Sequence, residues 1–201
     1  MRFTQAGIVF GILSVPALAS AQIKQPGDHR LYNVELEPHL VIEWNDVTPC
    51  SNDGFGPGFR ASIPFLDNGP IPRINNNMAI GVGLDWAHYS YNCYHAFYNG
   101  ADLNADVFTL PVVVQWNFFL THSISVFGEG GLVFRHTRWD YAYNSAPQGC
   151  INADGFCTSS RSDSGLDLTL AAGGRFMVSD SVGFLLRLGF PYVSAGVSIE
   201  L

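Results

Sequence analysis

Long hydrophobic runs are missing from this sequence, and charged residues are scarce. Beyond residue 22, no stretch approaches the ~18 consecutive apolar residues that a membrane-spanning helix needs. Charged residues make up 13% of the chain and hydrophobic residues 47%, whereas soluble domains usually carry about 25% charge. This composition, without a spanning helix, favours a protein that crosses a membrane with strands, because half the residues of such strands face lipid.

Positive charge is especially rare, since Lys24 is the only lysine and the net charge of the chain is −7. Nucleic-acid binding requires clustered Lys and Arg side chains that neutralise phosphates. We therefore expect no nucleic-acid partner. No pattern of residues indicates a cofactor.

The N-terminus has the three parts of an export signal. Arg2 supplies the positive charge, residues 6–15 form a short apolar stretch, and Ala19-Ser20-Ala21 gives a small-x-small cleavage pattern. The apolar stretch is too short for a spanning helix. We predict a signal peptide over residues 1–21, cleavage before Gln22, and a single domain over residues 22–201.

Apolar and polar residues alternate in eight segments of this domain, which predicts half-buried strands. The segments are 33–44, 59–65, 78–89, 107–119, 123–139, 166–178, 182–190 and 192–201. The connections alternate in length, as in membrane barrels with short periplasmic turns and long external loops. The long ones are 45–58, 90–106 and 140–165, while 121–122 and 179–181 are short, 66–77 is intermediate, and the last hairpin turns near Phe190-Pro191. We predict an all-β fold, an eight-stranded antiparallel up-and-down transmembrane β-barrel with both termini at the periplasmic end.

Apart from Arg138 at the end of one segment, charged residues on these segments share one face, opposite the apolar residues. An Arg or Lys on the lipid face would cost about 2–4 kcal/mol at mid-bilayer, so the charged face is expected to line the lumen. This predicted lumen charge network comprises Glu35, Glu37, Glu43, Arg60, Asp85, Glu129, Arg135, Asp167, Arg175, Arg187 and Glu200.

The interior of an eight-stranded barrel is just wide enough for side chains to fill it. Interior charges must therefore pair with one another or meet water. We expect Arg135 and Arg175, on adjacent strands, to neutralise Glu129, Asp167 and their neighbours inside the barrel, so that the pore is closed. A narrow conduit for ions or small solutes is the alternative.

Aromatic residues gather where the strands meet the connections, as amphipathic rings do at membrane interfaces. The predicted external rim holds Trp44, Trp86, Tyr89, Tyr91, Trp139, Tyr141 and Tyr143.

The final segment alternates up to the last residue, Leu201. It resembles the C-terminal signal by which outer-membrane barrels are recognised by their assembly machinery, with Leu201 in place of the usual terminal aromatic residue. In strand number and loop scheme the chain is similar to the small OmpA/OmpX-like barrels. This resemblance implies a monomer in the outer membrane, in contact with membrane lipid and lipopolysaccharide.

Four cysteines, Cys50, Cys93, Cys150 and Cys157, lie in predicted external loops. Disulfides are expected in an oxidising compartment, and four cysteines allow 3 connectivities. Turn-forming residues separate Cys150 from Cys157, and the loops of Cys50 and Cys93 rise from neighbouring hairpins, so we predict Cys50–Cys93 and Cys150–Cys157. Zinc binding, with His95 near Cys93, is the alternative, although no CxxC pair is present.

His88 and Ser90 share a strand face at the predicted rim, with Asp102 further along. They resemble the His-x-Ser arrangement of outer-membrane lipid A deacylases, in which His is the base and Ser the nucleophile. Tyr91 stands where that family has Asn. Our leading expectation is a non-enzymatic barrel that presents disulfide-stapled surface loops and supports envelope integrity or surface interaction. The alternatives are a deacylase that uses His88 and Ser90, and a narrow conduit.

Overall fold

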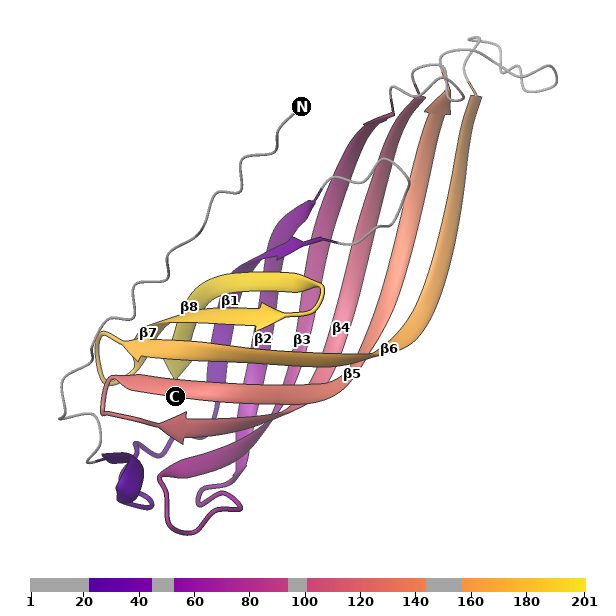
Figure 1. The fold of residues 1–201 in the computed structure, drawn as a ribbon. Coiled ribbons are helices and arrows are strands. Elements are labelled where there is room, and N and C mark those ends of the chain that lie inside the picture. The colour runs from indigo at the N-terminus through magenta and orange to yellow at the C-terminus, as the bar shows by residue number, and fades with distance from the viewer. Residues whose placement is uncertain (1–21, 45–52, 94–100, 144–156) are drawn as a thin grey trace, which may run out of the picture.

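The computed structural model describes residues 22–44, 53–93, 101–143 and 157–201, with backbone alone for 91–93, 101–103, 141–143 and 157–159. Eight antiparallel strands follow one another around a closed barrel (Figure 1). They are β1 (Glu35–Glu43), β2 (Gly54–Leu66), β3 (Asn76–Cys93), β4 (Ala101–Phe119), β5 (Ile124–Tyr143), β6 (Cys157–Met177), β7 (Val182–Gly189) and β8 (Tyr192–Glu200). The predicted all-β, eight-stranded antiparallel up-and-down barrel is confirmed. No helix in these ranges is long and apolar enough to cross a membrane.

The first and last strands close the ring. Glu35 of β1 lies opposite Glu200 of β8 in the register. Beyond it, Leu201 donates its amide hydrogen to the carbonyl oxygen of Val34 at 2.9 Å, and Val34 donates back at 3.3 Å. The alternation of the last segment therefore ends in a strand whose backbone is paired up to the final residue.

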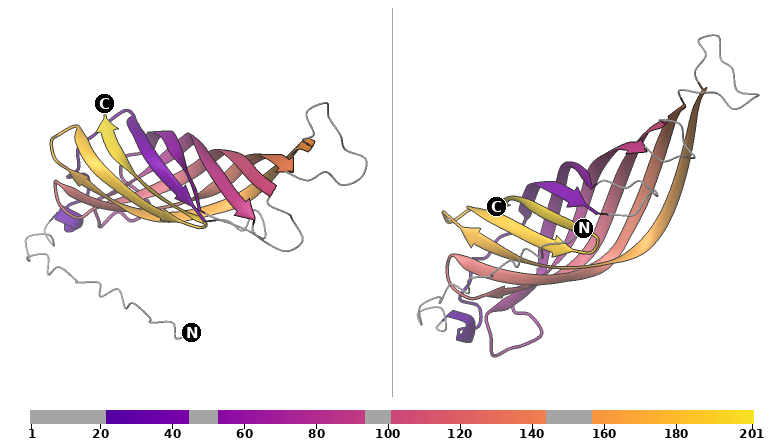
Figure 2. Two further views of the ribbon diagram at one scale, coloured as in Figure 1. Left: turned by 90° about the horizontal axis from the view of Figure 1, so that it is seen from above. Right: turned by 45° about the horizontal axis from the view of Figure 1, so that its top comes forward.

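The strands differ greatly in length, so part of the sheet rises above the barrel. Strands β3–β6 have 18 to 21 residues, whereas β1, β7 and β8 have 8 or 9. Pairing between β6 and β7 ends at Ala171 and Gly189. Figures 1 and 2 show β3–β6 continuing past the short strands as a four-stranded sheet.

We call this part the protruding sheet. It comprises the residues beyond the last outward apolar side chain of each strand, 87–93, 101–107, 135–143 and 157–165. Several of them were expected to lie in the long loops 90–106 and 140–165, and that expectation is wrong. They lack a regular alternation of apolar and polar residues, but their backbones pair in register with the neighbouring strands, which does not require an apolar face.

Below the protruding sheet, the outward face of the barrel is a belt of exposed apolar side chains. It includes Leu40, Ile42, Phe59, Ile63, Ile80, Val82, Leu84, Leu110, Val112, Val114, Leu132, Leu168, Leu170, Phe184, Leu186 and Leu188. The largest fully buried side chains are, by contrast, Arg60 and Arg187. A polar interior under an apolar exterior is the arrangement that lipid requires of a barrel.

The segment before β1 lies at the lower end of the barrel (Figure 1). It begins with the short 3-10 helix η2 (Gln22–Lys24), whose Ile23 carbonyl accepts a hydrogen bond from the Asn75 amide at 2.8 Å. The ring of His29 stacks on Phe119 with centroids 4.2 Å apart. Burial, with the Glu35 carboxylate nearby, raises the pKa of the Tyr32 phenol, so this buried ring stays neutral. The predicted signal peptide, residues 1–21, lies outside the described residues.

Candidate functional site

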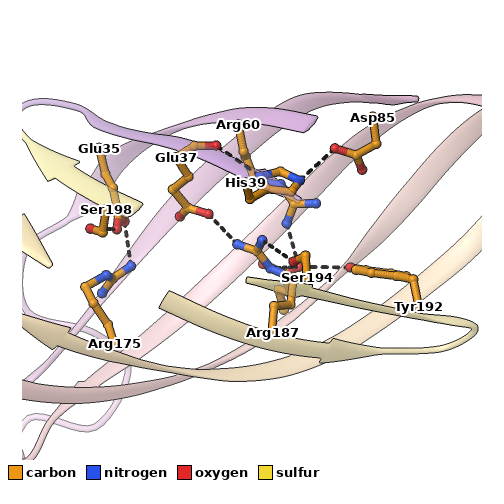
Figure 3. Close-up of polar contacts among 11 residues, drawn as sticks. Glu35, Glu37, His39, Arg60, Asp85, Arg175, Arg187, Tyr192, Ser194 and Ser198 are labelled. Carbon is orange, nitrogen blue, oxygen red and sulfur yellow. Dashed lines mark hydrogen bonds and ion pairs between the residues drawn. The ribbon is translucent and has the colours of Figure 1, made fainter. Parts of the chain in front are cut away.

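The lumen is filled by ion pairs that reach across it, beginning with Arg175 and Glu35 near the lower end (Figure 3). Arg175 Nη2 donates to Glu35 Oε2 at 2.6 Å, and neither side chain is exposed to solvent. The same guanidinium donates to the Ser125 hydroxyl at 3.1 Å, while the Ser198 hydroxyl donates to Glu35. This group joins β6 to β1, β5 and β8 through the interior.

Glu129 of β5 is the centre of the next layer. Its Oε1 accepts from Arg60 Nη1 at 2.6 Å and lies 2.9 Å from Arg187 Nε. Arg187 also donates through Nη2 to Glu37 Oε2 at 2.6 Å, and the Tyr192 hydroxyl lies 3.5 Å from Glu129. Charge-assisted bonds of this kind are among the strongest that side chains form.

An aromatic ring supports both layers. The ring of Phe127 lies 5.6 Å from the guanidinium carbon of Arg175 and 5.3 Å from that of Arg187, within the range of cation–π attraction. A Cβ at Gly173 would lie 2.2 Å from the Phe127 ring. The glycine is therefore required for the ring to occupy this place.

The upper layer consists of two further pairs. His39 Nε2 lies 2.9 Å from Asp85 Oδ1, and Arg135 Nη1 donates to Glu43 Oε1 at 2.5 Å. A Cβ at Gly58 would lie 2.3 Å from both His39 Nε2 and Asp85 Oδ1. The absence of a side chain at Gly58 thus allows the histidine to meet the carboxylate.

The expectation is wrong for the two carboxylates it named, because neither Arg135 nor Arg175 pairs with Glu129 or Asp167. Both arginines reach β1, where they meet Glu43 and Glu35, because a long side chain on the curved wall points across the lumen. Among the described residues, Asp167 and Glu200 form no ion pair, and Asp167 is exposed.

Sequence reasoning did not single out Phe127, Tyr192 or Ser198 as members of the lumen set. All three lie at positions of the same parity as the predicted lumen charges of their strands. Parity alone could therefore have identified them.

At the external rim, His88 meets an acid that the sequence did not indicate. His88 Nδ1 lies 2.9 Å from Asp106 Oδ1, on the outward face of β3 and β4, and Trp86 Nε1 donates to the same oxygen at 3.0 Å. Ser90 lies two residues along the same face. The side chain of Asp102, the acid considered from the sequence, lies outside the described residues. Asp106 could have been identified only from the β3–β4 register, which places it opposite His88.

Two rings expected at the rim face inward instead. Tyr89 is buried in a cluster with Ala87, Ala105 and Val107, and Trp139 packs against it. This apolar cluster lines the inner face of the sheet as it leaves the barrel.

A cavity of about 370 Å³ lies at the upper end of the lumen, beside the point where β7 and β8 end. Its lining combines charged residues of the lumen with apolar residues of the wall. The lining residues are Val41, Glu43, Arg60, Asp85, Ala87, Val107, Thr109, Pro111, Val133, Arg135, Asp167, Leu168, Thr169, Phe190, Pro191 and Tyr192.

The cysteines cannot be paired from the described residues. The backbones of Cys93 and Cys157 lie at the ends of β3 and β6, but their side chains, with Cys50, Cys150 and His95, fall outside the description. The pairing Cys50–Cys93 and Cys150–Cys157 stays a prediction. Within the described residues, no three His, Cys, Asp or Glu side chains are placed to hold a metal ion.

Comparison with known proteins gives a likeness in fold. No protein-family model and no curated protein matches the sequence. Among solved structures, the chain is similar to Ail, the attachment invasion locus protein of Yersinia pestis, with a TM-score of 0.46 and 12% identity over 84% of this chain and 96% of that chain. Ail in complex with the heparin analogue sucrose octasulfate gives a TM-score of 0.48 at 12% identity with the same coverage. Neisserial surface protein A gives 0.47 at 14% identity over 84% of this chain and 96% of that chain. This chain is a closed eight-stranded antiparallel barrel, and these proteins are similar to it in fold.

Proposed function

We propose that this chain is a non-enzymatic outer-membrane barrel that holds the protruding sheet outside the cell, where the free edge of β6 binds an extended segment of a partner protein. Export uses the N-terminal signal over residues 1–21, with cleavage before Gln22. The last strand, β8, is the segment that the assembly machinery recognises. The barrel is a monomer in contact with membrane lipid and lipopolysaccharide.

The apolar belt supports the membrane location. Its exposed side chains encircle the barrel, and a soluble monomer rarely exposes a continuous apolar patch larger than a few hundred Å². On β6 the belt ends at Leu166, and the outward side chains above it are Ser164, Ser162 and Ser160. The change from leucine to serine marks the level at which this strand leaves the lipid.

The free edge of β6 carries the surface-interaction part of the proposal. Pairing with β7 ends at Ala171, so the stretch from Cys157 to Leu170 is paired on its β5 side only, among the described strands. Such an edge presents unpaired N–H and C=O groups, which extended peptides use to add a strand. The serines on its outward face keep it soluble without covering the backbone.

The β6–β7 hairpin shows to which side the backbone N–H and C=O groups of β6 point. Val178 donates its amide hydrogen to Val182 on the β7 side, and alternate residues of an antiparallel strand point to the same side. The register of β6 runs without a shift on both sides. The amide of Ser162 therefore points to the free edge.

The test removes that one amide. Peptides selected from a random display library against the barrel in lipid nanodiscs should bind the wild type. Ser162→Pro should lower their affinity about tenfold, as for one lost backbone hydrogen bond. Proline is tolerated where the N–H faces outward from an edge strand. Ser162→Ala is the control, because it removes the hydroxyl and keeps the amide. Equal binding by Ser162→Pro and Ser162→Ala would contradict the proposal.

A second candidate, an outer-membrane acyl-ester hydrolase of the lipid A deacylase type, is favoured by the contact between His88 and Asp106. With Nδ1 held by Asp106, Nε2 of His88 is the nitrogen left to accept a proton. In this reaction Nε2 takes the proton of the Ser90 hydroxyl as Oγ attacks the ester carbonyl carbon. The leaving alcohol recovers that proton, and water then releases the acid from the acyl-enzyme.

Mass spectrometry of lipid A incubated with the barrel in detergent decides this candidate. The hydrolase requires release of a fatty acid that is lost in Ser90→Ala. Ser164→Ala is the matched control, because Ser164 also lies on the outward face beside a histidine, with its hydroxyl 2.8 Å from His136 Nδ1. An unchanged lipid A mass with the wild type would rule out the hydrolase.

A further inference from the structure

The wall of the barrel has a notch within the apolar belt. Leu166 and Leu168 of β6 lie opposite Phe134 and Leu132 of β5, which face outward in the same belt. All three residues Leu166, Leu168 and Leu170 lie above Ala171, where pairing with β7 ends. Figure 1 shows β6 rising past the end of the β7–β8 hairpin.

Within this notch no strand of the described residues lies on the β7 side of β6, although β5 is paired with it on the other side. Leu166, Leu168 and Leu170 have the parity that directs N–H and C=O toward the β7 side. Open sheet edges are not left bare in the hydrocarbon layer, because an unsatisfied polar backbone group there costs several kcal/mol. Donors and acceptors must therefore be supplied at this position from outside the described chain.

A second copy of the barrel is the less favourable source. Two barrels inserted in the same direction would pair their β6 strands in parallel, and parallel pairing is slightly less stable per residue than the antiparallel pairing of this sheet. A membrane lipid, by contrast, reaches the notch directly from the side.

The cavity behind the notch indicates which head group fits. Leu168 and Phe190, which are 83% and 79% exposed, form its outer lips and provide an apolar wall for an acyl chain. Inside, Asp167 is an exposed carboxylate without an ion pair, and Arg135 retains 18% exposure of its side chain beside Glu43. Asp167 lies opposite Val133, two residues from Arg135, so the two charges are diagonal neighbours.

We infer that the notch binds one membrane lipid with a zwitterionic aminoalkyl-phosphate head group. The ammonium meets Asp167, the phosphate meets the free edge of the Arg135 guanidinium, and the acyl chains lie along Leu168 and Phe190. The donors and acceptors of the head group form hydrogen bonds with the backbone C=O and N–H groups of β6 that are not paired with β7. An anionic head group lacks the donor for Asp167 and is the poorer ligand. This inference rests on the proposed insertion of the barrel in a membrane.

Native mass spectrometry of the full chain, purified in detergent, tests the site with phosphatidylethanolamine, phosphatidylglycerol and soluble glycerophosphoethanolamine. We expect one retained phosphatidylethanolamine, preferred over phosphatidylglycerol. Asp167→Asn should weaken it about tenfold, as for the loss of one hydrogen bond to a charged group. Asp163→Asn is the matched control, because Asp163 has the same parity on β6, is also exposed, and lies outside the cavity.

Each result supports or overturns the inference. Equal retention of the two lipids, or no difference between Asp167→Asn and Asp163→Asn, overturns it. Binding of the soluble head group as tight as that of the lipid also overturns it, because the apolar lips would then contribute nothing. Thr169→Trp, which fills the cavity from within, should abolish retention in a chain that still migrates as a folded barrel in an unheated gel. Failure of the wild type to insert into vesicles would instead contradict the proposed membrane location.

Discussion

At the scale of single residues, the interior is stabilised by arginines that each hold a carboxylate of a distant strand. Arg175 and Glu35 are 140 positions apart in sequence, and Arg187 and Glu37 are 150 apart. Removing one partner of such a pair leaves the other as a lone buried charge, which costs more than the pair itself contributes.

Replacement of Arg175 by Met should therefore lower the free energy of unfolding by about 3–5 kcal/mol. Arg138→Met is the control, because Arg138 forms an exposed pair with Asp140 at 3.5 Å, and such pairs contribute within about 1 kcal/mol. Urea titration of both variants in lipid vesicles measures the difference. Equal midpoints would show that Arg175 is not buried with Glu35.

Which residues face the lumen could be predicted from the sequence, but their partners could not. Alternation places Glu35, Arg60 and Arg187 on one face, because neighbouring positions of a strand point to opposite sides. Pairing across the lumen depends on the curvature of the wall and on the reach of each side chain. The contact between His88 and Asp106 likewise needs the β3–β4 register, which no local pattern in the sequence specifies.

At the scale of elements, β6 serves two environments along one strand. Its outward residues change from Leu166, Leu168 and Leu170 to serines at 160, 162 and 164. Sequence reasoning placed the leucines in a strand and the serines in a loop, because the period-two signal of a half-buried strand disappears when both faces are polar. The lower ends of the strands were easier to predict, since the apolar belt continues to the turns.

Substitution by arginine at two positions of β6 tests where this strand leaves the membrane. Leu170→Arg should lower the free energy of unfolding by about 2–4 kcal/mol, as for a charge placed on the lipid face. Ser162→Arg, on the same face of the same strand, should change it by no more than about 0.5 kcal/mol, as for a surface substitution. Equilibrium unfolding in vesicles provides both values, and a comparable loss in the two variants would contradict the assigned membrane level.

At the scale of the whole molecule, the lumen below the upper cavity is filled by side chains. Three layers of ion pairs and the Phe127 ring lie across it. This arrangement favours the closed barrel over the conduit considered from the sequence, because no file of water can pass through packed, paired side chains.

Planar bilayers containing the wild type should consequently show no steady conductance. Replacing Arg187 and Glu37 together with Ala removes both members of one pair and shortens two long side chains, so this variant should admit small ions. An open porin in the same bilayers is the positive control. Reproducible, long-lived open levels of the wild type would revive the conduit.

The pairing of β1 with β8 also has a consequence for the order of assembly. It joins Glu35 to Glu200, so the ring cannot close until nearly the whole chain has been delivered. Contacts this remote in sequence form slowly, because a long loop must be closed before they give any stabilisation. Until then β1 and β8 remain open edges of the kind that promote aggregation. A ribosomal product that ended before Tyr192, and so lacked β8, would therefore remain an unclosed sheet, with no neighbour for β1 at the seam.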